Sequence, residues 1–302
     1  MQLYKHYYKI HENTKMIIFM DKEITSEKNI QFLLEDLMVL NSIKVEYIIK
    51  PGIENDINLT NEDLDGTKKK KMIYFNKKGL LENNGSRVNS IDVVSLGYEE
   101  KINKILSNND NETVKHFLSE AKKLILNGKI DRAHIIPFKS KNLLYELLSI
   151  DGVGTIIGSK FGEPEIKGID SKDIPVVKSL LDANIKKGFL KPRNENYLQA
   201  NYKNFYIAYV DQIPVGCVEI IPINENTVEL GALSVIENFL CYKIGVRLTQ
   251  FVEFYAKNNK KIVISVTNNP KLEKIYLSNG YSLDTEGKYS FRSENHPEKN
   301  CI

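Results

Sequence analysis

The sequence is poor in the residues that form disulfide frameworks, metal sites and membrane spans. Its three cysteines, Cys217, Cys241 and Cys301, lie far apart and form no Cys-x-x-Cys pair. We therefore expect neither a zinc site nor a disulfide framework, which fits a reducing compartment. No apolar run approaches the length of a membrane-spanning helix, and the polar, aromatic start Met1–Lys9 lacks the apolar core of a signal peptide. These absences predict a cytoplasmic protein with no membrane partner.

An excess of charge of one sign is also absent. The chain of 302 residues carries 42 lysines and arginines against 39 aspartates and glutamates, which gives no support for a general nucleic-acid-binding surface. The longest basic run, residues 68–71, consists of lysine alone, without interleaved aromatic residues. We interpret this run as a solvated loop, and the alternative is a patch that binds phosphate or nucleic acid.

The first half contains apolar runs of strand and helix length in alternation. Residues 16–20 and 44–49 are predicted strands, and the stretch between them is a predicted helix that begins after Ser26. A strand, helix and strand of this length favour a parallel pair, and we expect the second strand to stop at Pro51-Gly52. Further predicted elements are a strand at 72–75, a helix at 113–126 that ends before Gly128, a strand at 133–136, a helix at 142–148 and a glycine-rich turn at 151–155.

The second half predicts a mixed sheet flanked by helices. Three apolar strands joined by short polar turns predict an antiparallel meander, and an α/β fold in two domains fits the length of the chain. The expected elements are a helix at 172–187 with Ser171 as its N-cap, a helix at 195–200, strands at 205–210, 215–221 and 227–236, a helix from Ile244, a strand at 261–267 and a last helix that carries Tyr276.

The stretch from Thr227 to Tyr281 resembles the acyl-CoA-binding half of the GNAT family of N-acetyltransferases in its order of strand, turn, helix, strand and helix. The resemblance covers roughly residues 160–292 and implies acetyl-CoA as acyl donor. The turn before Ile244 stands where the family holds the pyrophosphate, because a helix N-terminus offers unpaired N–H donors to an anion. Of the family signature only Gly245 matches, with Leu240 and Lys243 at the other positions, so an ordinary helix start is the alternative. The implied cofactor-binding residues are Leu233, Ser234, Val235, Tyr242, Lys243, Ile244, Gly245, Val246 and Asn269.

Two further residues match the catalytic positions of this family. Glu229 is the candidate proton acceptor, and in an alternating strand it shares a face with Gly231, Leu233 and Val235. Tyr276 is the candidate proton donor, because a phenol can protonate a leaving thiolate. The segment 269–281 resembles the family's Asn…Leu-Tyr…Gly-Phe ending, in which the asparagine bonds the pantetheine arm. The alternatives are a solvated glutamate at the strand end and a tyrosine in the helix core.

The first half resembles a shortened amino-acid kinase domain of the kind that precedes the acetyltransferase domain in N-acetylglutamate synthase. The resemblance depends on Leu33–Gly52, Met72–Gly85, Arg132-Ala-His-Ile-Ile136, Leu143–Leu148 and Asp151-Gly-Val-Gly-Thr155. It divides the chain into 14–155 and 160–292. Met20-Asp21-Lys22 and Lys50-Pro51-Gly52 stand where a kinase would have glycines that let backbone N–H groups approach phosphate. We therefore expect no kinase activity, and we interpret 151–155 as an interdomain turn rather than a phosphate loop.

This pairing of domains implies acetylation of the amino group of L-glutamate, as in the first step of arginine biosynthesis. A dicarboxylic substrate needs cations that bind a carboxylate through two parallel hydrogen bonds, and arginine does this best. Arg193 resembles the arginine of the family's Leu-x-Pro-Arg segment, and Arg292 resembles that of its late Tyr-x-Tyr-x-Arg stretch, with surface arginines as the alternative.

Other functions and partners are also considered. His134 and His116 are expected in core or surface roles, and no metal site is expected. Two other functions stay open, an acetyltransferase for another amine and a non-catalytic acyl-CoA-binding regulatory protein. A homo-oligomer is compatible with the sequence but not indicated by it.

Overall fold

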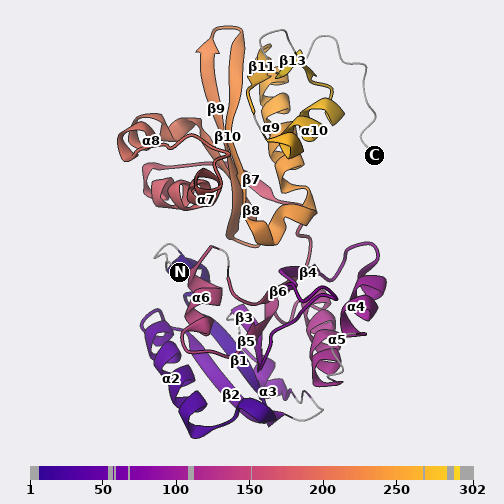
Figure 1. The fold of residues 1–302 in the computed structure, drawn as a ribbon. Helices are drawn as coiled ribbons and strands as arrows, with labels where there is room; N and C mark the ends of the chain where they lie inside the picture. Colours follow the sequence, from indigo (N-terminus) through magenta and orange to yellow (C-terminus); the bar gives the residue numbers. More distant parts are fainter. Residues whose placement is uncertain are drawn as a thin grey trace. The chain divides into compact units, whose positions relative to one another are not determined.

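The computed structural model describes residues 7–53, 57, 59–66, 69–107, 112–150, 152–267, 269–283 and 289–292. The chain divides into two compact units, 1–161 and 162–302. Within the described residues a six-stranded sheet forms the centre of the first unit and a seven-stranded sheet that of the second, as Figure 1 shows. Both units combine sheet and helices, so the predicted α/β class with two domains is confirmed.

The first unit is built on strands in the order β2-β1-β3-β5-β6-β4. Neighbouring strands run parallel except β5 and β6, which are antiparallel. The strands are β1 (Thr14–Asp21), β2 (Glu46–Ile53), β3 (Lys69–Asn76), β4 (Ser90–Asp92), β5 (Arg132–Pro137) and β6 (Thr155–Gly158), and the helices are α1 (Tyr8–His11), α2 (Glu27–Asn41), α3 (Asn61–Leu64), α4 (Tyr98–Leu106), α5 (Glu112–Leu126) and α6 (Asn142–Leu148).

The predicted unit of strand, helix and parallel strand is confirmed in β1, α2 and β2. Ser26 caps α2 by accepting a hydrogen bond from the backbone N–H of Asn29. The expected stop at Pro51-Gly52 is wrong, because β2 continues to Ile53. Since β2 lies at the edge of the sheet, a proline can sit in it without removing a hydrogen bond from an inner ladder.

The interpretation of the lysine run as a solvated loop is wrong for three of its four members. Lys69, Lys70 and Lys71 belong to β3, which lies between β1 and β5 in the sheet, while Lys68 lies outside the described residues. Lys71 is 1% exposed and Lys70 is 6% exposed, with the Lys70 ammonium donating to the Gly66 carbonyl oxygen. Strand pairing therefore overrides local composition here, because a long aliphatic stem can be buried while its ammonium reaches polar atoms.

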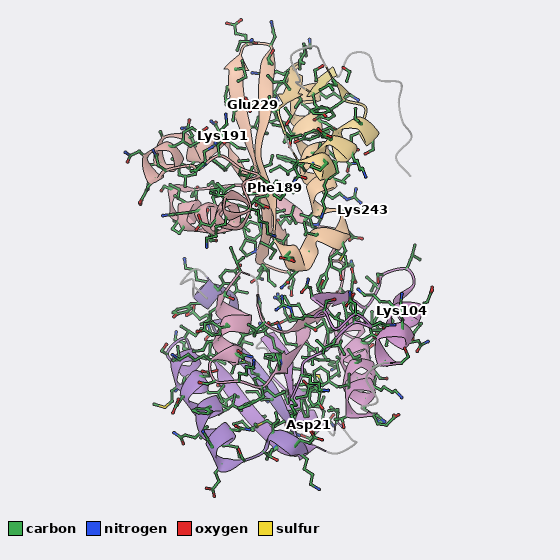
Figure 2. The ribbon with its side chains drawn as sticks, in the orientation of Figure 1. Asp21, Lys104, Phe189, Lys191, Glu229 and Lys243 are labelled. Carbon is green, nitrogen blue, oxygen red and sulfur yellow. The ribbon has the colours of Figure 1, made fainter. Side chains whose placement is uncertain are left out.

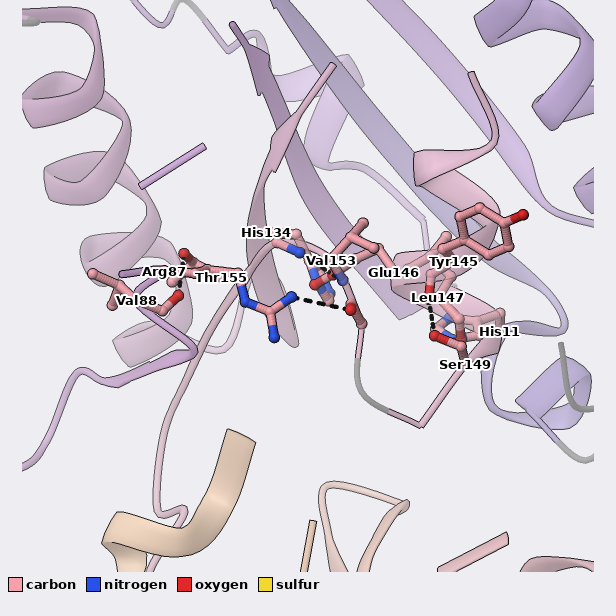
Figure 3. Close-up of polar contacts among 12 residues, drawn as sticks. His11, Arg87, Val88, His134, Tyr145, Glu146, Leu147, Ser149, Val153 and Thr155 are labelled. Atoms are coloured by element: carbon pink, nitrogen blue, oxygen red, sulfur yellow. Dashed lines mark hydrogen bonds and ion pairs between the residues drawn. The ribbon is translucent and has the colours of Figure 1, made fainter. Parts of the chain in front are cut away.

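A buried carboxylate organises the turn at residues 152–155. This turn lies inside the first unit, between α6 and β6, so the interpretation of the motif as an interdomain turn is wrong. Glu146 on α6 accepts hydrogen bonds from the backbone N–H groups of Val153 at 2.8 Å and Gly154 at 2.6 Å. The same carboxylate lies 2.7 Å from Nδ1 of His134 on β5, as Figure 3 shows. The backbone N–H groups of Val153 and Gly154, which a phosphate loop would offer to a phosphate, are therefore already bonded to Glu146. Asp151, which opens the motif in the sequence, lies outside the described residues.

The charge states of this pair follow from its burial. Burial lowers the pKa of His134, and the neighbouring Glu146 only partly offsets this effect. Burial alone would raise the pKa of Glu146, but the bonds from His134, Gly154 and Val153 outweigh it and hold that pKa below its usual value. Glu146 is therefore an anion that accepts from the Nδ1–H of a neutral His134. Burial also lowers the pKa of His11, well below its usual value.

Acidification below about pH 6.5 is expected to destabilise the first unit. Unfolded histidines take up a proton near that pH, whereas His11 and His134 resist protonation in the fold because their pKa values are lowered. The unfolded state then binds more protons, so the free energy of unfolding falls as the pH falls. Hydrogen exchange of β5, corrected for the intrinsic rate, should report less protection at pH 5 than at pH 8. His11→Gln should weaken this dependence and the exposed-site change His116→Gln should not; protection that is independent of pH would contradict the prediction.

The second unit is built on strands in the order β12-β13-β11-β10-β9-β8-β7. The predicted meander is confirmed, since β8, β9 and β10 pair antiparallel in sequence order, whereas β10 and β11 are parallel. The strands are β7 (Glu165–Gly168), β8 (Phe205–Val210), β9 (Ile213–Asn224), β10 (Thr227–Val235), β11 (Ile262–Ser265), β12 (Ser282–Leu283) and β13 (Tyr289–Arg292), and the helices are α7 (Ile174–Lys186), α8 (Glu195–Asn201), α9 (Ile244–Asn258) and α10 (Pro270–Ser278).

The helices of this unit lie on both sides of its sheet. In Figure 1, α7 and α8 lie to one side of the long strands β9 and β10, and α9 and α10 lie to the other. The predicted N-cap Ser171 is wrong, because a capping box of Asp170 and Asp173 precedes α7 and Ser171 lies inside the short 3-10 turn that they close. Gly188, at φ +75°, follows α7 in the left-handed conformation expected of a helix stop.

Candidate active site

A pocket opens where β10 and β11 separate. The two strands pair only from Thr227 to Glu229 and from Ile262 to Ile264, although β10 continues to Val235. Beyond this point a pocket of about 540 Å³ is lined by residues 188–193, 229–233 and 265–267 together with Leu272 and Tyr276. Because pairing with β11 has ended, residues 230–233 of β10 border the pocket on that side, while β10 stays paired with β9 on the other.

A β-bulge in β10 changes which side chains face this pocket. Gly231 pairs with Glu219 and Ser234 with Cys217, so three steps along β10 match two along β9. Ala232 lies in the bulge at φ +48°. The extra residue reverses the alternation, so the expectation that Leu233 and Val235 share a face with Glu229 is wrong.

The bulge turns the side chain of Ser234 toward α7. Its Oγ donates to the Leu180 carbonyl oxygen at 2.6 Å and accepts from Nδ2 of Asn184 at 2.6 Å. A contact between Ser234 and a cofactor would therefore be made by its main chain. The side chain of Val235 lies on the opposite face, close to Gly245 at the start of α9.

The two candidate catalytic residues line the same pocket. Glu229 is half-buried on β10, and Figure 2 shows it on the central strands of the second unit. Tyr276 on α10 is 1% exposed, and its hydroxyl lies 3.0 Å from Oγ of Ser265. Burial, together with the charge of Glu229, raises the pKa of Tyr276 to about 12, although the bond from Ser265 opposes this shift. The phenol is thus protonated at neutral pH, as a proton donor must be.

Arg193 lines the pocket and is held by a carboxylate that the sequence prediction missed. Its Nε and Nη2 atoms both lie 3.3 Å from Oε2 of Glu219 on β9, and Glu219 is fully buried. The hydroxyl of Tyr197 on α8 donates to the other oxygen of this carboxylate at 2.5 Å. The signal available in the sequence was a single carboxylate inside the apolar strand 215–221.

Lys243 and Asn269 are not among the described residues that line this pocket. The 3-10 turn Glu237–Tyr242 leads into α9, and Lys243 precedes the helix at φ +59°. Figure 2 shows Lys243 at this helix start. Asn269 already caps α10, since its Oδ1 accepts from the backbone N–H of Lys271. Arg292 pairs with Ile262 through its backbone in β13, but its side chain lies outside the described residues, so its role stays a prediction.

Two kinds of feature are absent from the described part of the chain. No group of three or more histidine, cysteine, aspartate and glutamate residues there could hold a metal ion. None of the helices there has the length and apolar character needed to cross a membrane.

Comparison with known proteins gives the class of the second unit. Residues 177–281 match the model of the acetyltransferase (GNAT) family, so the chain carries a GNAT acetyltransferase domain. The chain is 27% identical over 133 residues to the amino-acid acetyltransferase of Photobacterium profundum and 26% identical over 133 residues to that of Aliivibrio fischeri. Each match covers 43% of this chain and only 30% of the relative.

The whole fold has a solved counterpart. It is similar to N-acetylglutamate synthase from Neisseria gonorrhoeae complexed with coenzyme A and L-arginine, with a TM-score of 0.53 and 13% sequence identity. This similarity covers 95% of this chain and 97% of the other. The second unit therefore matches the GNAT family model, and the fold of the chain is similar to that of N-acetylglutamate synthase, as the resemblance in the sequence predicted.

Proposed function

We propose that this chain transfers the acetyl group of acetyl-CoA to the amino group of L-glutamate. The observation that carries the proposal is that one pocket of the GNAT domain is lined by Glu229, Tyr276 and Arg193. A carboxylate can accept the proton of the amine, and a protonated phenol can donate to the leaving group. A guanidinium can bind a carboxylate of the acceptor through two hydrogen bonds. The curated relatives named amino-acid acetyltransferase support an amino acid as the acceptor.

Each of these groups has its own role in the proposed reaction. Acetyl-CoA supplies an activated acyl group, and the separation of β10 from β11 offers its extended arm a strand edge. Glu229 removes the proton from the ammonium of the acceptor, which is charged at neutral pH. As the new C–N bond forms and the C–S bond breaks, Tyr276 donates its proton to the leaving sulfur, and the second proton that the nitrogen loses on forming the amide restores the phenol. The N-terminus of α9, with Lys243 and Gly245, is the proposed holder of the pyrophosphate.

The domain division follows from the same proposal. Residues 160–292 would form the acetyltransferase domain, and 14–155 a shortened amino-acid kinase-like domain without kinase activity. The ends of β1 and β2 support the second assignment. The Asp21 carboxylate there accepts from the Tyr74 hydroxyl at 3.0 Å, and the Lys50 ammonium pairs with Asp63 at 2.6 Å. These two separate pairs of side chains lie where a nucleotide site would present glycine N–H groups.

Release of coenzyme A from acetyl-CoA tests the function directly. The acceptors compared should be L-glutamate, L-aspartate, L-glutamine, a polyamine and a peptide with a free N-terminus. The highest kcat/KM is expected with L-glutamate. Preference for the polyamine or peptide would replace glutamate but keep the acetyltransferase. Binding of acetyl-CoA without turnover on any amine would instead favour the regulatory alternative.

A further inference from the structure

The contacts of Arg193 leave one edge of its guanidinium for a ligand. Nε and Nη2 point to a single oxygen of Glu219, which occupies the side edge of the planar fork. The edge formed by Nη1 and the second N–H of Nη2 has the spacing that binds a carboxylate in two parallel hydrogen bonds. The arginine is 18% exposed and lines the pocket, so a ligand there can reach this edge.

Glu219 is held more firmly than a surface partner would be. It is 0% exposed, and a buried carboxylate is stable only when it is paired. One oxygen takes both bonds from Arg193, and the other takes the hydroxyl of Tyr197. The carboxylate also lies just behind the pocket wall, since a Cβ built on the pocket residue Gly231 would be 3.7 Å from its Oε2.

Tyr197 restricts the arginine a second time. The guanidinium carbon of Arg193 lies 5.0 Å from the centre of the Tyr197 ring, within the range of a cation–π contact. The Tyr197 ring therefore limits motion of the guanidinium. Its hydroxyl also holds the Glu219 carboxylate to which the guanidinium donates. A long, flexible side chain thus loses most of its freedom before a ligand arrives, which lowers the entropic cost of binding.

We propose that Glu219 and Tyr197 are positioning residues, which hold Arg193 with one edge toward the pocket and so make the site select acceptors that carry a carboxylate. This inference rests on the proposed function, because it assigns the origin of its acceptor specificity. Glu219 has a second consequence. It offsets the positive charge of Arg193, so selection comes from the direction of two hydrogen bonds more than from net charge.

The test compares an acid with its amides in three proteins. The kcat/KM values for L-glutamate, its γ-amide and its α-amide are measured for the wild type, Glu219→Gln and Tyr197→Phe. The wild type should prefer glutamate over one amide by at least about tenfold, the size of one hydrogen bond to a charged group. In both variants the preference should fall to within about threefold, while kcat at saturating acceptor and the KM for acetyl-CoA change little. The ratio of acid to amide does not depend on the fraction of protein that is folded.

The control is Glu225→Gln, the same chemical change at an exposed position in the turn between β9 and β10. It should leave the preference unchanged. A preference retained in Glu219→Gln and Tyr197→Phe would show that the cluster is structural only and would overturn the inference. A large loss of kcat in Glu219→Gln with the preference retained would also overturn it, because Glu219 would then act in proton transfer.

A binding experiment decides the inference even if no acetyl transfer is found. Calorimetric titration of L-glutamate and its two amides, in the presence of coenzyme A, gives the same ratio from Kd values. Loss of the carboxylate preference in both variants supports the positioning role, whatever becomes of the proposed reaction. A wild type that binds acid and amides equally, or binds none of them, overturns it.

Discussion

Glu229→Gln should lower kcat by about 100-fold to 10,000-fold, the usual contribution of a positioned general base. Glutamine keeps the size and a polar tip but cannot accept the ammonium proton, so the amine stays charged and cannot attack. Acetyl-CoA binding should be unaffected, because the change lies on the acceptor side of the proposed reaction. Steady-state kinetics with the best acceptor, together with a Kd for acetyl-CoA, measures both quantities.

Two further measurements make this prediction specific. Glu225→Gln changes an exposed glutamate in the turn before the same strand, and its kcat should match that of the wild type. Raising the pH should partly restore the rate of Glu229→Gln, because solvent then deprotonates more of the amine. An unchanged kcat in Glu229→Gln would remove this residue as the base and leave the fold assignment intact.

Glu146→Ala should destabilise the first unit by at least about 3 kcal/mol, because three buried donors lose their acceptor at about 1–3 kcal/mol each. The change leaves Nδ1–H of His134 and the backbone N–H groups of Val153 and Gly154 without their acceptor. Buried donors without acceptors carry most of that cost. Protection of β5 and α6 against hydrogen exchange, extrapolated from urea, measures the loss within this unit.

A surface glutamate of the same unit provides the matched control. Glu120 on α5 pairs with Lys123 one turn away at 3.4 Å, and Glu120→Ala should change the free energy of unfolding by no more than about 0.5 kcal/mol. If Glu146→Ala were no more harmful than Glu120→Ala, the carboxylate would not hold the 152–155 turn.

Strongly periodic stretches of the sequence predicted the fold well. The helix α5 and the strand β8 lie within one residue of their predicted bounds, because a continuous apolar stripe or run must be buried whatever surrounds it. The segments that failed were those in which local composition and tertiary pairing disagree. The lysine run indicates a solvated loop by its composition, yet Lys70 and Lys71 are buried in β3, where Lys71 lies between β1 and β5.

Only part of the candidate site was predicted from the sequence. Glu229, Tyr276 and Arg193 were found by their resemblance to a family pattern, and the structure places them around one pocket. Glu219 and Tyr197 were not found, because neither belongs to a motif and their partner lies far from Glu219 in the sequence. The face of Ser234 was also missed, since one extra residue in β10 reverses the alternation after it and leaves no mark in the hydrophobic pattern.

The sequence by itself determined the α/β class and the order of most elements, because the burial of apolar stripes and the positions of turn-forming residues are local properties. The GNAT character of the second half was predicted by its resemblance to the motifs of that family. Only the tertiary structure decided what meets across the chain: which carboxylate grips Arg193, where β10 leaves β11, and which N–H groups Glu146 occupies. The first two depend on strand register and on the separation of β10 from β11, and a shift of one residue would change both. The third depends on how α6 packs beside the turn at 152–155.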